Sequence, residues 1–368
     1  MNLNQKNKSC YIHIPFCDHI CSYCDFCKMF YNSNFVDRYL LELEKEIDSL
    51  YSNEVLDTIY IGGGTPSCLS VDELEKLFRI INKLKRSKSC EYTIEGNFNS
   101  TSKEKLDLYK KYGVNRLSFG IESIDKNNLR LLDRSLDKDE VIDIINYSKS
   151  IDLDNINVDL IYAIPGEDIN TLDKDIDFIL SLDVKHISTY SLMIEDNTKL
   201  KINNTKYIEE DIDYSMYKHI CNRLNNYNHY EISNFSTLGY ESRHNLCYWK
   251  NDNYYGFGLG ASSYINNIRY TNTKSLNKYL DGKYILDKEI LNKEDIIEYE
   301  IILNLRLKEG IDLLYFKDKY NIELNKLYDY NNLVKGKLLV LDNNKLYIPE
   351  DKLYVSNEII VKLLENKI

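Results

Sequence analysis

Four of the nine cysteines lie within eleven residues, in the segment Cys17-Asp18-His19-Ile20-Cys21-Ser22-Tyr23-Cys24-Asp25-Phe26-Cys27. Cysteines this close together usually bind a metal or form disulfides. Thiolates spaced as Cys17, Cys21 and Cys24 are can bind three irons of a cubane cluster and leave the fourth iron open. Three alternatives stay open: a structural zinc site, buried cysteines without a special role, and a four-cysteine electron-transfer cluster that includes Cys27.

A second motif is the run Gly62-Gly63-Gly64-Thr65-Pro66-Ser67. It lacks the Lys-Ser/Thr of a P-loop and the spacing of a dinucleotide fingerprint, so phosphate binding is not indicated. Residues without Cβ let a ligand approach backbone polar groups closely. A simple turn is the alternative, although three consecutive glycines exceed what a turn needs.

The elements that must position these motifs alternate between strands and helices from Ser9 to about Asp183. The expected strands are 10–16, 55–62, 91–97, 114–122, 156–163 and 185–193, and the expected helices are 34–51, 70–87, 102–112, 137–151, 170–182 and 209–227. Ser70-x-x-Glu73 and Thr101-x-x-Glu104 have the form of capping boxes. Repeated strand–helix order predicts parallel strands with right-handed crossovers. The predicted fold is therefore α/β, a partial (βα)6 barrel.

Polar residues occupy every second position of four expected strands. These sets are Tyr11 and His13; Thr93, Glu95 and Asn97; Arg116, Ser118, Gly120 and Glu122; and Asn157 and Asp159. Because strand side chains alternate in direction, each set lies on one face. We interpret this alternation as the polar lumen of a barrel that binds a polar ligand. The alternative is an antiparallel sheet with one face in contact with solvent. In parallel barrels the carboxyl-terminal rim carries the active site, so we expect both motifs to converge there.

The rest of the chain predicts two further regions. The barrel is expected over residues 9–236, an aromatic and glycine-rich connecting segment over 237–291, and a small α+β domain over 292–368. Helices followed by a hairpin give this last domain a winged-helix-like order. It lacks a basic recognition face, so protein contact or plain packing is expected there rather than DNA binding.

Composition limits the classes of partner. The formal net charge of −11 argues against a general nucleic-acid binder. No hydrophobic run is long enough to cross a bilayer, and the polar start is not a signal peptide. We therefore expect a cytoplasmic protein whose clustered thiols stay reduced and favour metal over disulfide.

Several motifs together resemble the radical S-adenosylmethionine (SAM) superfamily, in its coproporphyrinogen dehydrogenase-like branch. The cysteine motif and the glycine motif both match this branch. The other matching segments are 115–123, Asp159-Leu160-Ile161, Pro165-Gly166, His186-Ile187-Ser188-x-Tyr190, Tyr230-Glu231-Ile232-Ser233-Asn234-Phe235 and His244-Asn245-x-x-Tyr248-Trp249. The resemblance runs from about residue 9 to 310.

Within the branch the choice lies between a decarboxylating dehydrogenase and HemW-type haem chaperones. The dehydrogenases typically carry a further cysteine where this chain has Phe26, and a long extension before the cluster motif, which begins here at Cys17. The chain is similar to the HemW type in both respects. This implies transfer of haem to an acceptor protein, with transient contact to a membrane protein possible. The alternatives are oxygen-independent coproporphyrinogen III dehydrogenase and a metal-stabilised interaction protein.

The resemblance also implies roles for individual residues. Cys17, Cys21 and Cys24 would bind a 4Fe-4S cluster, and Gly63, Gly64 and Thr65 would meet the methionine end of SAM. Five further positions match SAM contacts, namely Tyr11, Glu95, Glu122, Arg134 and Asp159. HemW-type proteins are expected to bind haem, and the first candidate for its axial ligand is His244. The other candidates are His13, Cys247 and Cys27. Each of three residues also has a purely structural interpretation. Arg134 could form a surface salt bridge, and Asp159 could be a core carboxylate whose hydrogen bonds are satisfied. His244 could be a structural histidine.

Three departures from the family pattern bear on the site. Glu122 stands where the family often has Gln, which keeps an acceptor but removes a donor. Phe98 replaces the Pro of a Glu-x-Asn-Pro motif, and Leu136 replaces the His of an Arg-x-His motif.

Overall fold

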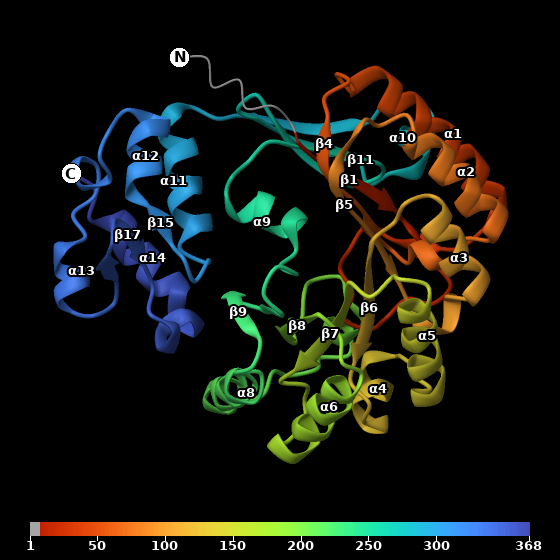
Figure 1. Ribbon diagram of the computed structural model, residues 1–368, viewed down its shortest axis with the longest axis horizontal. Helices are drawn as coiled ribbons and strands as arrows, with labels where there is room; N and C mark the ends of the chain where they lie inside the picture. Colours follow the sequence, from red (N-terminus) through yellow and green to blue (C-terminus); the bar gives the residue numbers. More distant parts are fainter. Residues whose placement is uncertain (1–7) are drawn as a thin grey trace. The chain divides into compact units, whose positions relative to one another are not determined.

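The computed structural model describes residues 8–368, and a parallel sheet organises its first two hundred residues or so (Figure 1). Its strands pair in chain order and all in parallel: β1 (Ser9–Ile14), β4 (Leu56–Gly63), β5 (Arg86–Gly96), β6 (Arg116–Glu122), β7 (Ile156–Tyr162) and β8 (His186–Ser191). All six strands coincide with the predicted ones to within a few residues. The predicted α/β fold with a partial barrel is confirmed.

Helices connect successive strands, as the alternating pattern predicts. They are α1 (Ser33–Leu50), α2 (Val71–Ile81), α3 (Lys103–Lys111), α5 (Lys138–Ser150), α6 (Ile169–Ser181) and, after β8, α8 (Glu210–Arg223). Two short helices, α4 (Lys126–Leu132) and α7 (Lys199–Ile202), have no counterpart in the prediction. The capping box of Ser70 and Glu73 is confirmed at α2. The one proposed at Thr101 is wrong by a residue, because Ser102 caps α3 by accepting from the Lys105 amide.

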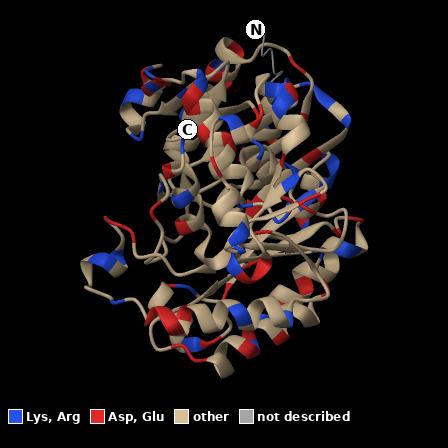
Figure 2. Ribbon diagram, turned by 90° about the vertical axis from the view of Figure 1, so that its left-hand side faces the viewer, with Lys and Arg blue, Asp and Glu red and all other residues tan. Residues whose placement is uncertain are grey.

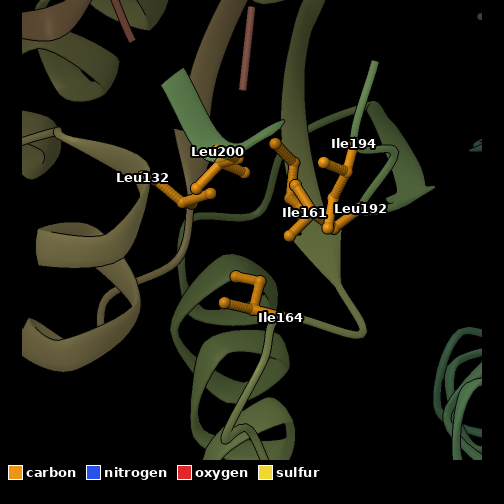
Figure 3. Packing of buried hydrophobic residues seen from close by; sticks show 6 residues of the cluster. All are labelled: Leu132, Ile161, Ile164, Leu192, Ile194 and Leu200. Carbon is orange, nitrogen blue, oxygen red and sulfur yellow. The ribbon is translucent and has the colours of Figure 1, made fainter. Parts of the chain in front are cut away.

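The two faces of the parallel strands differ as the period-two pattern predicts. The apolar set, which includes Ile12, Ile61, Ile94, Leu117 and Val158, is at most 1 % exposed and forms the core. Next to the cysteine loop a further apolar cluster joins the ends of β7 and β8 to α4 and α7 (Figure 3). It consists of Leu132, Ile161, Ile164, Leu192, Ile194 and Leu200.

A second group of strands extends the sheet beyond β1. β11 (Tyr254–Phe257) pairs in parallel with β1, and β12 (Ser262–Ile265), β13 (Ile268–Asn272) and β14 (Ile285–Ile290) continue as an antiparallel meander. The short helix α10 (Leu276–Leu280) lies between β13 and β14 in sequence. The glycine-rich part of the chain therefore contributes strands to the barrel sheet.

The chain separates into two compact units, one reaching Arg223 and including 253–290, the other made of 224–252 and 291–368. The segment 237–291 is thus divided between them. The second unit contains β9 (Asn228–Glu231), β10 (Asn234–Ser236), α9 (Arg243–Trp249), α11 (Lys293–Asn304), α12 (Leu313–Tyr320), α13 (Asn331–Lys335) and α14 (Ser356–Glu365). A small antiparallel sheet of β15 (Ile311–Asp312), β17 (Lys345–Tyr347) and β16 (Val340–Asp342) completes it.

Basic and acidic residues, blue and red in the ribbon of Figure 2, are interspersed along the helices. Many of them pair across neighbouring helices, as Lys76 of α2 does with Asp37 of α1 at 2.6 Å and Lys103 of α3 with Asp143 of α5 at 2.9 Å. Such exposed pairs contribute little stability each. No helix of residues 8–368 is both long enough and apolar enough to cross a membrane.

Candidate functional site

One pocket lies at the carboxyl-terminal ends of the parallel strands and is lined by residues from at least six segments of the chain. The cysteine loop contributes Cys17, Cys21, Tyr23, Cys24, Phe26 and Lys28, and the glycine loop contributes Gly63, Gly64 and Thr65. The strands and the residues that follow them contribute Glu95, Asn97, Ser118, Gly120, Glu122 and Asp159, and the chain after α4 contributes Arg134. The polar positions of β5, β6 and β7 therefore face the same space as the thiols. This is the convergence that the barrel prediction requires.

The cysteine loop leaves β1 and is closed by a pair of two-residue parallel strands, β2 (Phe16–Cys17) and β3 (Met29–Phe30). The amide of Met29 donates to the Pro15 carbonyl and that of Tyr31 to the Cys17 carbonyl, both at 2.7 Å. Ser22 anchors the middle of the loop, because its amide donates to Leu132 O at 3.0 Å and its hydroxyl to Leu131 O at 2.6 Å. The backbone of the loop is thus held at three points.

No cysteine of residues 8–368, in this loop or elsewhere, forms a disulfide. Burial raises the pKa of the Cys17 thiol to about 12, although a hydrogen bond with Thr65 opposes the shift. Burial also raises the pKa of Cys24. Buried thiols deprotonate most readily when a cation takes the place of the proton, which is the condition for metal ligation.

The separation of the thiols distinguishes between kinds of metal site. Among residues 8–368, no three or more His, Cys, Asp and Glu side chains are close enough together to hold one metal ion. Zinc needs its ligands around a single point. In a cubane cluster each cysteine binds a different iron, so three thiols need not converge. The arrangement of Cys17, Cys21 and Cys24 around one pocket fits the cluster and gives no support to a zinc site.

The glycine loop follows β4 and packs tightly against the start of the cysteine loop. Gly63 has a φ of 115°, and a Cβ built there would lie 2.5 Å from the ring of His13. A Cβ at Gly64 would lie 2.7 Å from the Phe16 carbonyl oxygen, and one at Gly62 equally close to the Glu95 carboxylate. All three glycines are therefore required by neighbouring protein atoms. Gly63 and Gly64 in addition line the pocket.

Two buried carboxylates reach the pocket from its floor. Glu95 accepts from the Tyr60 hydroxyl at 2.7 Å and from the Gly63 amide at 3.0 Å, and burial raises its pKa. Asp159 accepts from Asn157 Nδ2 at 2.8 Å, and burial together with the charge of Glu122 raises its pKa to about 7. Both groups are acceptors with spare capacity for a ligand's hydroxyl or ammonium groups.

Glu122 and Arg134 form an ion pair at the rim, with Nη1 of Arg134 3.3 Å from Oε1 of Glu122. Glu122 ends β6 in a left-handed conformation (φ 58°), and its Oε1 accepts from the Tyr23 hydroxyl at 2.7 Å. Oε2 of Glu122 is buried without a hydrogen-bond partner. A buried acceptor left unpaired is costly, so this oxygen is suited to receive a donor from a bound molecule.

Two of the residues proposed from the sequence lie outside the pocket lining. The Tyr11 hydroxyl is 2.9 Å from Nδ1 of His13, whose Nε2 is 2.7 Å from the Cys27 carbonyl. Because a carbonyl only accepts, Nε2 carries the proton and Tyr11 donates to Nδ1. Tyr11 therefore supports the site from beneath. His244 belongs to the second unit, is 1 % exposed and has Nε2 2.7 Å from the Tyr248 hydroxyl.

Some residues at the pocket were not singled out from the sequence. Tyr23 and Lys28 are two of these and line the pocket. The polar strand faces predicted from the sequence include Ser118, which lines the pocket, and His13, which holds the far end of the cysteine loop through Cys27. The position of Tyr23 between Cys21 and Cys24 was the available signal for it. Cys27 lies outside the pocket, with its Sγ packed against Gly260, where a Cβ would be 3.0 Å away.

Comparison with known proteins gives two family matches. Residues 11–179 match the radical SAM superfamily, and residues 291–351 match the HemN C-terminal domain. Among curated proteins, the chain is 37 % identical to the heme chaperone HemW of Lactococcus lactis, over 98 % of each chain. It is 35 % identical to HemW of Bacillus subtilis, over 96 % of this chain and 98 % of that one.

Among solved structures, coproporphyrinogen III oxidase (HemN) from Escherichia coli, a radical SAM enzyme, superimposes with a TM-score of 0.85. The match covers 98 % of this chain and 91 % of that one, at 20 % sequence identity. At this identity the match establishes a shared fold, including the C-terminal domain.

Proposed function

This chain belongs to the radical SAM superfamily and, within it, to the HemW family, and from that premise we propose that it is a haem chaperone. It would bind a 4Fe-4S cluster, SAM and haem, and would transfer the haem to an acceptor protein in the cytoplasm. The observation that carries the proposal is the pocket that gathers three free thiols, a glycine loop and buried carboxylates. Similarity over the whole length to proteins named HemW supports the haem-carrying function.

Each group in the pocket has chemistry suited to part of this task. Cys17, Cys21 and Cys24 would hold the cluster, whose open iron provides a site for the amino and carboxylate groups of SAM. Gly63, Gly64 and Thr65 expose backbone to the methionine end. Of the remaining proposed contacts, Glu95 and Asp159 would accept from the ammonium or ribose hydroxyls, and Glu122 would use its unpaired Oε2.

Anaerobic reconstitution with iron and sulfide tests the cluster. The expected result is broad visible absorbance of a cluster type in the wild-type protein and its loss in Cys17→Ala, Cys21→Ala and Cys24→Ala. Cys27→Ala is the matched control, because Cys27 belongs to the same loop but lies outside the pocket. Absorbance that survives Cys24→Ala and disappears in Cys27→Ala would reverse this assignment.

The haem proposal concerns His244 on α9 of the second unit. Its Nε2 is engaged with Tyr248, so ligation of haem iron requires that this hydrogen bond be broken. Haem titration followed by the Soret band should show a changed spectrum in His244→Ala. His229→Ala, which removes another buried histidine of the same unit, should leave the spectrum unchanged. An unaltered spectrum in His244→Ala removes this residue as ligand.

The rival function is oxidative decarboxylation of coproporphyrinogen III, which the shared fold with HemN leaves chemically conceivable. Phe26, at the position where the decarboxylating relatives typically carry cysteine, lines the pocket and is 66 % exposed. Anaerobic incubation with coproporphyrinogen III, SAM and a reductant should yield no protoporphyrinogen. Formation of that product would overturn the chaperone proposal.

A further inference from the structure

The guanidinium group of Arg134 is in direct contact with one of the three pocket thiols. Its Nη1 donates to Sγ of Cys21 at 3.5 Å. Its Nη2 donates to the Gly120 carbonyl at 2.9 Å and to Oδ1 of Asn97 at 3.3 Å. Because the guanidinium is planar, these two bonds fix the direction in which Nη1 points. The N–H group is therefore held toward the sulfur by β5 and β6, independently of any ligand.

Glu122 provides the counter-charge for this guanidinium. Its carboxylate lies 3.3 Å from Nη1, and the two side chains are only 8 % and 10 % exposed. Glu122 is held in place by Tyr23 and by its own backbone, which folds the side chain over Gly120. With so little water nearby, the charges of this ion pair, whose Nη1 lies 3.5 Å from Sγ of Cys21, are poorly screened.

The positive charge of Arg134 persists over the usable pH range. Burial acts to lower the pKa of Arg134, but Glu122, Tyr23 and Cys21 act in the opposite direction and leave that pKa raised. An arginine is in any case always protonated in proteins. The positive charge beside Cys21 is thus permanent.

We propose that Arg134 and Glu122 set the reduction potential of the cluster, with Arg134 raising it through an N–H···S hydrogen bond to Cys21 and Glu122 lowering it. This inference rests on the proposed cluster binding. Hydrogen bonds to cluster sulfurs and nearby charge are established determinants of such potentials. Uptake of one electron makes the cluster more negative, so a donated N–H and a positive charge stabilise the reduced state, and a carboxylate opposes it.

The proposal assigns Arg134 a role that needs no SAM. Its Nη1 and Nη2 already contact four protein groups: the Cys21 thiol, Glu122, Gly120 and Asn97. A ligand carboxylate would have to share these donors with Glu122. Measurements on the reconstituted protein without SAM therefore isolate the effect on the cluster.

The test is a redox titration of the reconstituted cluster, followed by electron paramagnetic resonance in the absence of SAM. Glu122→Gln, which keeps the shape but removes the charge, should shift the midpoint potential to a more positive value. Arg134→Met should shift it to a more negative value, and Arg134→Lys, which keeps the charge without the planar fork, should give a smaller negative shift. Lys199→Gln is the control, since this cation also lies near the loop but is 61 % exposed and paired with Asp133 at 2.6 Å. Its potential should equal that of the wild type.

The outcomes separate this inference from the function on which it rests. A cluster that forms in Glu122→Gln with an unchanged or more negative potential overturns the inference and leaves cluster binding intact. Arg134→Met with the wild-type potential does the same. If Arg134→Met retains no cluster, the midpoint potentials of Glu122→Gln and Arg134→Lys still test the inference. Failure of the wild-type protein itself to form a cluster would overturn the proposed function.

Discussion

Gly63 connects backbone conformation to the geometry of the pocket. Its φ of 115° disfavours any residue with a Cβ, and the ring of His13 occupies the space that a Cβ would need. That ring also holds Cys27 at the end of the cysteine loop. A substitution at Gly63 therefore acts on the loop through His13.

Gly63→Ala should reduce cluster content after reconstitution to a small fraction of the wild-type level and lower the free energy of unfolding. Backbone strain alone contributes about 1–3 kcal/mol to this loss. Gly166→Ala is a matched control, because Gly166 has a φ of 91° with nothing within 4 Å of its built Cβ. Iron and sulfide content together with urea denaturation measure both effects. Equal cluster content in the two variants would show that the contact with His13 does not matter.

For individual residues, the sequence predicts which strand side chains face the pocket but not all of the contacts that they make there. Strand alternation identified Glu95, Glu122 and Asp159 as facing a common space, because period two depends only on local geometry. It did not reveal that Tyr23 contacts Glu122, since that hydrogen bond joins residues 99 positions apart. The family resemblance implies a SAM contact at Tyr11, yet the Tyr11 hydroxyl is engaged by His13 below the pocket.

The cysteine loop is an element without regular structure, so a few hydrogen bonds fix its shape. Ser22 is 3 % exposed and links the loop to the end of α4 and, through its carbonyl, to the Leu200 amide at 3.0 Å. Ser22→Ala removes the hydroxyl bond to Leu131 and should cost about 1 kcal/mol. The looser loop should release iron to a chelator several-fold faster than the wild type.

Ser49→Ala is the control for this experiment. The Ser49 hydroxyl also donates to a backbone carbonyl, that of Glu46 at 2.8 Å, but on exposed α1. Its rate of iron release should match the wild-type rate. If both variants release iron equally fast, the anchoring role of Ser22 is wrong.

The link between α1 and the glycine-rich strands depends on Glu46. This carboxylate is fully buried and accepts from the Gly258 amide at 2.8 Å, Nδ2 of Asn272 at 2.6 Å and the Tyr279 hydroxyl at 2.6 Å. Glu46→Ala leaves three buried donors without an acceptor and should lower the free energy of unfolding by about 3–5 kcal/mol. Urea denaturation followed by circular dichroism measures the change.

Glu44→Ala, in the same helix, provides the comparison. Glu44 is half-exposed and pairs with Lys83 at 2.7 Å, so its removal should cost less than about 1 kcal/mol. A similar loss of unfolding free energy in both variants would mean that the buried acceptor is not the cause of the effect.

Elements were predictable where the signals are local. The capping box of α2 and the alternation of strands and helices fixed most boundaries to within a few residues. The parallel pairing of β11 with β1 could not be predicted, because it joins segments more than two hundred residues apart and glycines weaken the strand pattern. Gly256 is required there, since a Cβ would lie 1.9 Å from the Ser262 carbonyl oxygen.

For the whole molecule, the sequence located a distinct C-terminal domain but not the division into two units. The second unit combines residues 224–252 with 291–368, and this discontinuity arises because β11–β14 return to the barrel sheet. The only tryptophan, Trp249, belongs to this unit. Its fluorescence therefore reports on the second unit separately from the barrel.

Glu231 makes the stability of the second unit depend on pH. Burial raises the pKa of this carboxyl from 4.5 to about 7, although Asn234, the Ser233 amide and Arg306 oppose the shift. The folded state thus holds a proton that the unfolded state releases above pH 4.5. The contribution of Glu231 to stability is therefore fully present below pH 4.5 and is lost as the pH rises through 7. The shift corresponds to about 3 kcal/mol.

Urea denaturation monitored by Trp249 fluorescence should show a free energy of unfolding that decreases between pH 5 and pH 8. Glu231→Gln is neutral throughout and keeps an oxygen to accept from Asn234, so it should remove much of this decrease. Glu358→Gln, which replaces an exposed carboxyl on α14 of the same unit, should keep the wild-type slope. The difference between the two variants isolates the buried carboxyl, because His229, Glu350 and Lys308 are common to both. A wild-type slope in Glu231→Gln would mean that Glu231 is ionised in the folded protein and that its burial is compensated by Asn234 and Arg306.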